Sequence, residues 1–129
     1  MSAPTYYLAA SSASPTKARE CMADLEALGL TCLYDWTRLD EPLDRWPTVA
    51  ADELDAVGNA DVFVMLAPPV SPVSQGACSE LGARLMSRKP AHVVGYAGFF
   101  THHRLVVRHE TWREFLQAVK ALGYGPVTT

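Results

Sequence analysis

Short apolar runs alternate along the chain with stretches in which apolar residues recur at helical spacing. The apolar runs predict five strands, at residues 6–10, 31–34, 61–67, 91–95 and 105–109. The run at 61–67 is apolar throughout after Asp61, as is typical of a central parallel strand that is buried on both faces. The stretches between the runs carry the start and stop signals of helices.

The first helix is expected directly after the strand at 6–10. Ser14 can cap its start, and Pro15 suits its first position, because the N–H that proline lacks would have no partner there. Gly29 supplies the end of the helix. Its apolar residues recur every three or four positions, at Ala18, Cys21, Met22, Leu25 and Leu28. This spacing predicts one buried face.

The middle of the chain predicts two shorter helices. Residues 35–47 are polar and contain prolines, so we expect a loop there. Thr48 would cap a helix that runs to Val57, with Leu54 and Val57 facing inward. A further helix is expected at 77–87. Its inner face would consist of Cys78, Leu81 and Leu85.

The end of the chain predicts a last helix. Thr111 and Glu114 form a capping box at its start, and Gly123 closes it after Leu122. The resulting order of elements is β-α-β-α-β-α-β-β-α, which predicts an α/β fold. We expect a three-layer domain of the flavodoxin or Rossmann-like type, with a five-stranded, mostly parallel sheet in the order 2-1-3-4-5 and helices on both faces.

Sheets of this type bind ligands where the strand order reverses, beyond the carboxyl ends of the strands. Here that point lies between the first and third strands. The loops at 11–14 and 68–76 should therefore meet, and the prolines of the second loop exclude a helix or a central strand there. A chain of 129 residues corresponds to one domain, which we expect to span residues 1–129.

Composition and charge narrow the range of partners. The formal net charge of -3 argues against a nucleic-acid backbone as the partner. No apolar run is long enough to span a membrane, and residues 1–5 do not resemble a signal peptide, so we expect a cytoplasmic protein. We interpret Cys21 and Cys32 as small core residues. No P-loop, dinucleotide fingerprint or zinc spacing is present, so we expect no metal or cofactor.

The segment from Ser74 to Glu80 is the strongest candidate for chemistry. It places a carboxylate in the first turns of a helix that begins at the expected ligand site, where the helix N-terminus favours the ionised form. An ionised, positioned carboxylate can attack an anomeric carbon. Two plainer interpretations remain open: acidic residues are common in first turns, and Glu80 could form a surface ion pair with Arg84.

Three blocks of the sequence resemble the nucleoside 2-deoxyribosyltransferase family and its nucleotide N-hydrolase relatives. The first is Tyr7-Leu-Ala-Ala-Ser, and the second covers residues 53–64, with Ala-Asp-Val at its end. The third is Ser74-x-Gly-x-x-x-Glu80-Leu-Gly, which is followed by Arg-Lys-Pro and a strand. Residues 99–103 and 111–115 resemble a branch of small family members. Together the blocks cover residues 6–116, and the cover is weakest at 35–47.

The resemblance implies roles for individual residues. Glu80 matches the family's nucleophile, and Tyr7 matches the tyrosine that orients it. Glu53 falls where the family has an aspartate near the leaving base, so it could protonate the base; a solvated helix face is an equal alternative. Asp61 matches an aspartate that we interpret as structural.

Ser74 departs from the family, because the transferases usually carry there an aspartate that holds sugar hydroxyls. A serine can donate to a 5′-phosphate that a carboxylate would repel. Ser11, Ser12, Gly76 and the helix start could complete an anion cradle. This suggests a monophosphate substrate with water as the acceptor. The alternative is that Ser74 is an ordinary loop residue.

The remaining polar and aromatic residues have plainer interpretations. Trp36 or Trp46 could stack on a base, although burial of a hydrophobic loop residue is the more common reason for such a tryptophan. His92 is expected to pack at the edge of the core. His102 and His103 lie in a loop before the last strand and could contact a phosphate or a neighbouring subunit.

The sequence thus predicts cleavage of the N-glycosidic bond of a nucleoside or its 5′-monophosphate, through a Glu80 nucleophile and a covalent glycosyl-enzyme intermediate. Water or another base would be the acceptor, with hydrolysis favoured. The resemblance also implies a homo-oligomer, at least a dimer, in which a neighbour helps to close the site. The rival hypotheses are a catalytically silent nucleotide-binding or interaction module and an NAD-cleaving nucleosidase.

Overall fold

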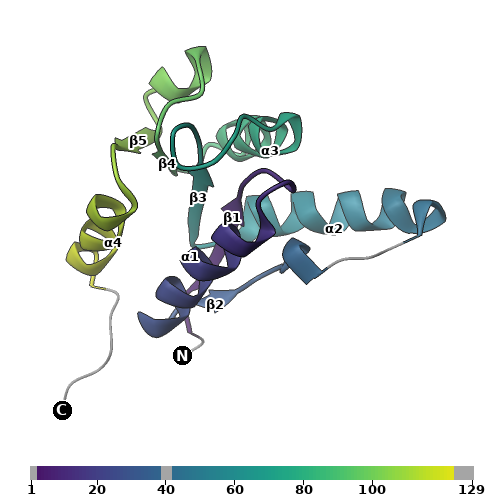
Figure 1. The fold of residues 1–129 in the computed structure, drawn as a ribbon, viewed down its shortest axis with the longest axis horizontal. Helices are drawn as coiled ribbons and strands as arrows, with labels where there is room; N and C mark the ends of the chain where they lie inside the picture. Colours follow the sequence, from purple (N-terminus) through teal and green to yellow (C-terminus); the bar gives the residue numbers. More distant parts are fainter. Residues whose placement is uncertain (1–2, 39–41, 124–129) are drawn as a thin grey trace.

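The computed structural model describes residues 3–38 and 42–123, and these form a parallel sheet with helices on both faces (Figure 1). Its strands are β1 (Thr5–Ala9), β2 (Thr31–Cys32), β3 (Val62–Leu66), β4 (Ala91–Val94) and β5 (Val106–His109). Its α-helices are α1 (Pro15–Ala27), α2 (Trp46–Asn59), α3 (Gln75–Met86) and α4 (Trp112–Ala121). Short 3₁₀ helices are η1 (Trp36–Arg38), η2 (Leu43–Arg45) and η3 (Phe99–His102).

The strand order of this sheet is β2-β1-β3-β4-β5, and every neighbouring pair is parallel. This confirms the predicted α/β fold and its order. Parts of two predictions fall outside the described residues: 39–41 of the expected loop, and 1–2 and 124–129 of the expected domain. None of the described helices is long and apolar enough to cross a bilayer.

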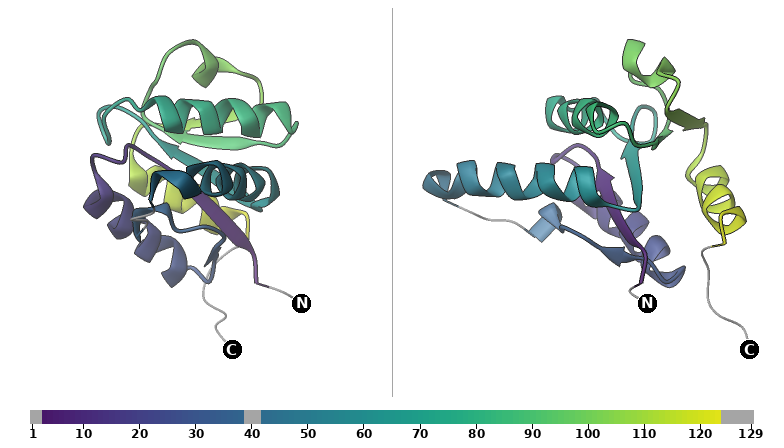
Figure 2. Two further views of the ribbon diagram at one scale, coloured as in Figure 1. Left: turned by 90° about the vertical axis from the view of Figure 1, so that its right-hand side faces the viewer. Right: turned by 180° about the vertical axis from the view of Figure 1, so that it is seen from behind.

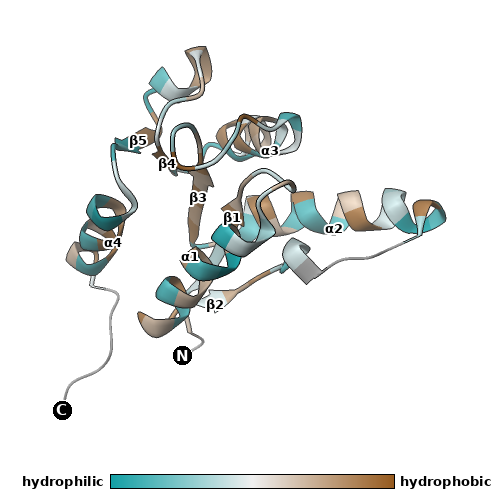
Figure 3. Cartoon of the chain, viewed as in Figure 1, coloured by the Kyte–Doolittle hydropathy of each residue, from teal (hydrophilic) through white to brown (hydrophobic). Residues whose placement is uncertain are grey.

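Alternate residues of the strands build a separate hydrophobic core on each face of the sheet. Tyr6 and Leu8 of β1 point into the core beneath α1 and α4, whereas Tyr7 and Ala9 point into the core beneath α2 and α3. β3 is buried along its whole length and is brown in Figure 3. Figure 2 shows from two further sides how the helices cover both faces. The sheet thus lies between two layers of helices, with α1 and α4 on one face and α2 and α3 on the other.

The start and end of the outer helices agree largely with the sequence signals. Ser14 precedes α1, although its side chain makes no capping hydrogen bond, and Gly29 follows the helix with φ 89°. Thr111 caps α4 by accepting from the N–H of Glu114 at 3.1 Å. The Glu114 carboxylate accepts in turn from the N–H of Glu110 at 3.1 Å, one residue earlier than a capping box requires.

Helix α2 corrects the prediction for the middle of the chain. It begins at Trp46 rather than after Thr48, so the loop expected at 35–47 is shorter and contains η1 and η2. Val57 is buried as predicted, but Leu54 is 48% exposed, so its predicted inward orientation is wrong. The buried residues of α2 are Ala56 and Val57, and Leu54 lies outside this buried face. Figure 1 shows that α2 extends at its N-terminal end beyond the sheet.

The sequence also misplaced two element boundaries. The strand expected at 31–34 ends at Cys32, where the chain leaves the sheet. Helix α3 begins at Gln75, with Ser74 as its capping residue, so Gly76 lies inside the helix rather than in the preceding loop. On the predicted inner face of α3, Leu81 and Leu85 are buried, whereas Cys78 is only half-buried.

Two local contacts hold the ends of neighbouring strands together. Asp61 accepts from the N–H of Thr5 at 2.8 Å and from its hydroxyl at 3.2 Å, which joins the two strand starts and supports a structural role for Asp61. At the carboxyl ends of the strands, Gly95 follows β4 with φ +104°, and a Cβ there would lie 2.4 Å from the carbonyl oxygen of Pro68, which follows β3. Only glycine allows this close approach, which holds the loop from β3 to α3 in place.

The pair His92 and His109 yields a prediction on acid stability. The two rings lie 3.0 Å apart between Nδ1 and Nε2, and the His92 ring packs edge-on against Phe115. Burial, with smaller contributions from His109 and Arg84, lowers the pKa of His92 from 6.5 to about 4. The unfolded chain therefore binds a proton that the folded chain excludes between these pH values, and stability is lost as the pH falls through this window.

We expect His92→Phe to remove this sensitivity. The difference in free energy of unfolding between wild type and variant should change by about 2–3 kcal/mol between pH 7 and pH 4, in favour of the variant at low pH. Urea unfolding at several pH values measures it, with the exposed His102→Phe as the control. A pH-independent difference would contradict the account.

Candidate functional site

A cavity of about 520 Å³ opens at the carboxyl ends of β1 and β3, where the strand order reverses. Its walls come from β1 and the loop after it, from η1, from α2 and from the start of α3. Ser12 and Ser74 both line it, so the two loops predicted to meet do so. The volume is within the range of pockets that bind small molecules.

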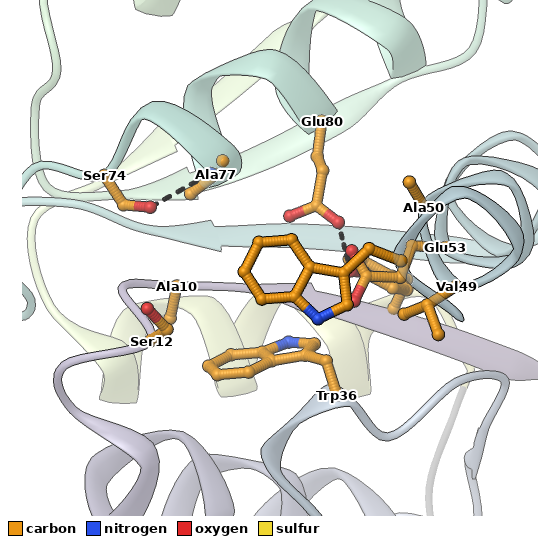
Figure 4. Close-up of a pocket in the computed structure, with 12 residues that line it drawn as sticks. Ala10, Ser12, Trp36, Val49, Ala50, Glu53, Ser74, Ala77 and Glu80 are labelled. Carbon is orange, nitrogen blue, oxygen red and sulfur yellow. Dashed lines mark hydrogen bonds between the residues drawn. The ribbon is translucent and has the colours of Figure 1, made fainter. Parts of the chain in front are cut away.

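Glu80 lies at the floor of this cavity, in the second turn of α3. Its side chain is only 9% exposed. The hydroxyl of Tyr7, a fully buried residue of β1, donates to Glu80 Oε2. The Tyr7 ring stacks on Phe63 of β3, its partner in the strand register, with centroids 6.1 Å apart. Figure 4 shows that the other carboxylate oxygen, Oε1, faces the open cavity.

The pKa of Glu80 departs from the sequence-based expectation. Burial, the largest effect, raises it from 4.5 to about 7; the Tyr7 hydrogen bond opposes this rise, and the nearby Glu53 adds to it. The expected help from the helix N-terminus is weak, because Glu80 comes six residues after the cap, beyond the unpaired N–H groups of the first turn. Burial likewise raises the pKa of Tyr7, so its hydroxyl keeps the proton that it donates.

Glu53 approaches the same cavity from α2. It is half-buried, and burial raises the pKa of its carboxyl group. In Figure 4 it lies near Val49 and Ala50, on the opposite side of Glu80 from Ser12 and Ser74. The cavity therefore has two chemically different ends with a carboxylate between them.

Hydroxyl and amide groups gather at the other end. The Ser74 hydroxyl oxygen accepts from the N–H of Ala77 at 3.2 Å, which leaves its own proton available for donation. The N–H groups of Gln75 and Gly76 have no acceptor among the described residues. Of the four residues predicted for an anion cradle, Ser12, Ser74 and Gly76 line the cavity.

Ser11, the fourth predicted cradle residue, does not line the cavity. It is buried, and its hydroxyl oxygen accepts from the N–H of Ala13 at 3.2 Å. Its bond shapes the turn that presents Ser12. His102 and His103 also lie away from the cavity lining, in and after η3.

The apolar walls include residues that the sequence left undecided or missed. Trp36 lies beneath the cavity, and its Nε1 donates to the Leu8 carbonyl oxygen at 2.7 Å. Trp46 also lines the cavity and is 59% exposed. Val49 and Ala50 were missed. They share with Trp46 and Glu53 the spacing i, i+3, i+4, i+7, which would have placed all four on one face of a helix that begins at Trp46.

Arg84 does not form the surface ion pair with Glu80 that the sequence suggested. It is 1% exposed, and its guanidinium donates to the backbone carbonyl oxygens of Val57, Ala60 and Pro90. The i, i+4 spacing permits either arrangement, and the packing of α3 against α2 turns Arg84 inward. In residues 3–38 and 42–123, no three His, Cys, Asp or Glu side chains lie close enough to hold a metal ion.

A parallel five-stranded sheet with a cavity at its switch point defines a Rossmann-like, ligand-binding class of fold. The CMP N-glycosidase BcmB of Clostridium botulinum has this fold, with a TM-score of 0.60 and 19% identity over 91% of this chain and 98% of that one. The 2-deoxyribosyltransferase of Bacillus psychrosaccharolyticus has it too, with a TM-score of 0.67 and 18% identity over 96% of this chain and 99% of that one.

No family model and no curated protein matches the sequence. The two solved structures establish the fold that the resemblance of the motifs implied, and that prediction is confirmed.

The raised pKa of Glu80 predicts that ionisation of this residue lowers the free energy of unfolding. In the folded chain Glu80 is protonated below about pH 7, whereas in the unfolded chain it ionises above 4.5. Its ionisation therefore destabilises the fold increasingly as the pH rises through this window. Glu80→Gln, which cannot ionise but can still accept from Tyr7, should raise the free energy of unfolding by about 2–3 kcal/mol at pH 8 and by less than about 1 kcal/mol at pH 5.

Thermal or urea unfolding at the two pH values measures this difference. Glu20→Gln, an exposed change on α1, serves as the control and should leave stability unchanged at both. A Glu80→Gln variant that is less stable at pH 8 than wild type would contradict the buried, weakly solvated carboxylate described above.

Proposed function

We propose that this chain cleaves the N-glycosidic bond of a nucleoside or nucleoside 5′-monophosphate, with Glu80 as the nucleophile. The Glu80 carboxylate carries the proposal: it is buried at the cavity floor, held by Tyr7 through one oxygen and open to the cavity through the other. A positioned carboxylate is what displacement at an anomeric carbon requires. A CMP N-glycosidase and a 2-deoxyribosyltransferase share the fold, and both names describe chemistry at such a bond.

In the first step Glu80 Oε1 attacks C1′ of the sugar, and the C1′–N bond breaks with its electron pair leaving on the base. Glu53 is the candidate donor of the proton that the base takes up, because burial raises the pKa of its carboxyl group. In the second step water or another base attacks C1′ of the resulting ester. The ester oxygen leaves with its electron pair, the incoming proton passes to Glu53 or solvent, and the carboxylate is restored.

The two ends of the cavity support one orientation of the substrate. Val49, Ala50 and Glu53 suit a flat, partly polar base, and the sugar then lies over Glu80. Ser12, Ser74 and the free N–H groups at the start of α3 suit a 5′-phosphate. No lysine, arginine or histidine is among the residues that line the described cavity, so the phosphate would be bound by neutral donors and the helix dipole.

Ser74 also favours hydrolysis over transfer within this proposal. The transferases that the sequence resembles carry an aspartate at this position, and its charge would repel a phosphate. We therefore favour a deoxynucleoside 5′-monophosphate as substrate and water as acceptor. The proposal further includes membership of the nucleoside 2-deoxyribosyltransferase family, an assembly of at least two copies and a cytoplasmic location, which rest on the resemblance and the composition.

A screen for released base tests the proposal. The protein is incubated with each deoxynucleoside and each 5′-monophosphate, with and without an added acceptor base, and the products are separated by chromatography. We expect free base from monophosphates, and a loss of at least about 10³-fold in turnover for Glu80→Gln. Glu20→Gln should match wild type. Turnover that survives Glu80→Gln would overturn the assignment, and silence of wild type with thermal stabilisation by nucleotides would favour a binding module.

The screen also tests the role of Ser74 through Ser74→Asp. Aspartate caps a helix as well as serine does, so α3 should keep its start. Its charge should lower kcat/KM for monophosphates at least about tenfold relative to deoxynucleosides, through repulsion of the phosphate. Equal effects on both substrate classes would contradict a contact between Ser74 and the phosphate. Exchange of bases between nucleosides by wild type would contradict water as the preferred acceptor.

A further inference from the structure

Arg84 is a buried cation whose hydrogen bonds join three segments of the chain. Its Nε donates to the carbonyl oxygen of Pro90 at 2.9 Å, just before β4. Its Nη1 donates to the carbonyl oxygens of Val57 at 3.0 Å and Ala60 at 2.7 Å, at the C-terminal end of α2. One side chain of α3 thereby fixes the distance from α3 to the end of α2 and to the start of β4.

Arg84 supplies geometry as well as stability at this position. Among the described residues no carboxylate forms an ion pair with Arg84, although the charge of Asp61 attracts it, and three carbonyl oxygens replace the water that the guanidinium loses. An apolar residue here would leave these carbonyl oxygens without their donor, which costs stability. What the guanidinium adds over an apolar side chain is its planar set of fixed donors, and therefore geometry.

The geometry relates Arg84 to both carboxylates of the cavity. Arg84 follows Glu80 by one helical turn on α3, and Val57, whose carbonyl it holds, follows Glu53 by one turn on α2. The two helices pack against each other on the same face of the sheet. The hydrogen bond from Arg84 to Val57 thus joins α3 and α2 one turn after Glu80 on the first helix and one turn after Glu53 on the second.

A second chain of contacts leads from Arg84 to the same carboxylate. The guanidinium carbon lies 6.0 Å from the centroid of the Phe63 ring. That ring stacks on Tyr7, whose hydroxyl donates to Glu80. Arg84 therefore supports the helix that carries Glu80 and the aromatic ring beneath the tyrosine that binds it.

We propose that Arg84 is a positioning residue, which sets the separation between Glu53 and Glu80 and keeps water away from Glu80. The inference rests on the proposed function of these two carboxylates. The titratable groups that face Glu80 are Tyr7 from β1 and Glu53 from α2. If α2 and α3 part, water reaches Glu80 and Glu53 moves away, and both changes favour the ionised form of Glu80.

Kinetics of Arg84→Met and Arg84→Lys test this role. We expect Arg84→Met to lower kcat about 10–100-fold with KM within about threefold, because a displacement of about 1 Å is enough to misalign a nucleophile. The acid limb of the pH profile should move from near pH 7 to lower pH. Arg84→Lys, which keeps one charged donor group, should lie between Met and wild type. Arg113→Met, an exposed change on α4, should behave as wild type.

A purely structural role predicts a different result. It would lower activity in proportion to the folded fraction, which thermal unfolding measures, and would leave the acid limb of the pH profile in place. That outcome overturns the proposal. Wild-type kinetics in a folded Arg84→Met variant would overturn it as well. In Arg84→Ala, low millimolar guanidinium should restore part of kcat, whereas urea, its neutral analogue, should not.

A test without turnover separates this inference from the proposed function. The Glu80 carboxyl carbon can be titrated by NMR in wild type and in Arg84→Lys, with no substrate present. A lower Glu80 pKa in the variant supports the positioning role even if the base-release screen fails, and an unchanged pKa contradicts it even if the screen succeeds.

Discussion

The contact between the Glu80 carboxylate and the Tyr7 hydroxyl is the interaction on which the whole site depends. Burial opposes ionisation of Glu80, the tyrosine hydrogen bond favours it, and the balance sets a pKa of about 7. A carboxylate in water would always be ionised but strongly solvated, and a buried one without a donor would stay protonated. At neutral pH this balance provides a carboxylate that is both available and poorly solvated, which suits nucleophilic attack.

The fold provides this contact through a few rigid constraints. The parallel register of β1 and β3 sets Tyr7 beside Phe63, so the tyrosine can move only by disturbing the core. Gly95 permits the close approach that holds the loop before α3, and the Ser74 cap begins that helix at the cavity. Tyr7 and Glu80 therefore lie on a strand and a helix, which hold side chains more precisely than loops do, and α2, η1 and the loop after β1 supply further walls of the cavity.

The sequence predicted the sheet, its order and the meeting of the loops, because buried strands and helix caps leave local signals, as residues 61–67 and Thr111 do. It also brought Tyr7 and Glu80 together, through a resemblance to known motifs. It misjudged Leu54 and Arg84 for one shared reason. Periodicity shows which residues share a helix face, but whether that face meets a strand, solvent or remote carbonyl oxygens depends on packing between segments far apart in the chain.

The central claim is that Glu80 forms a covalent bond with the sugar, and intact mass measurement after rapid acid quenching tests it most directly. With a deoxynucleoside 5′-monophosphate, the account predicts that wild type gains the mass of the deoxyribose phosphate unit and that the peptide containing Glu80 carries it. Glu80→Gln should gain nothing. Release of base by wild type with the added mass on a different residue would contradict the account.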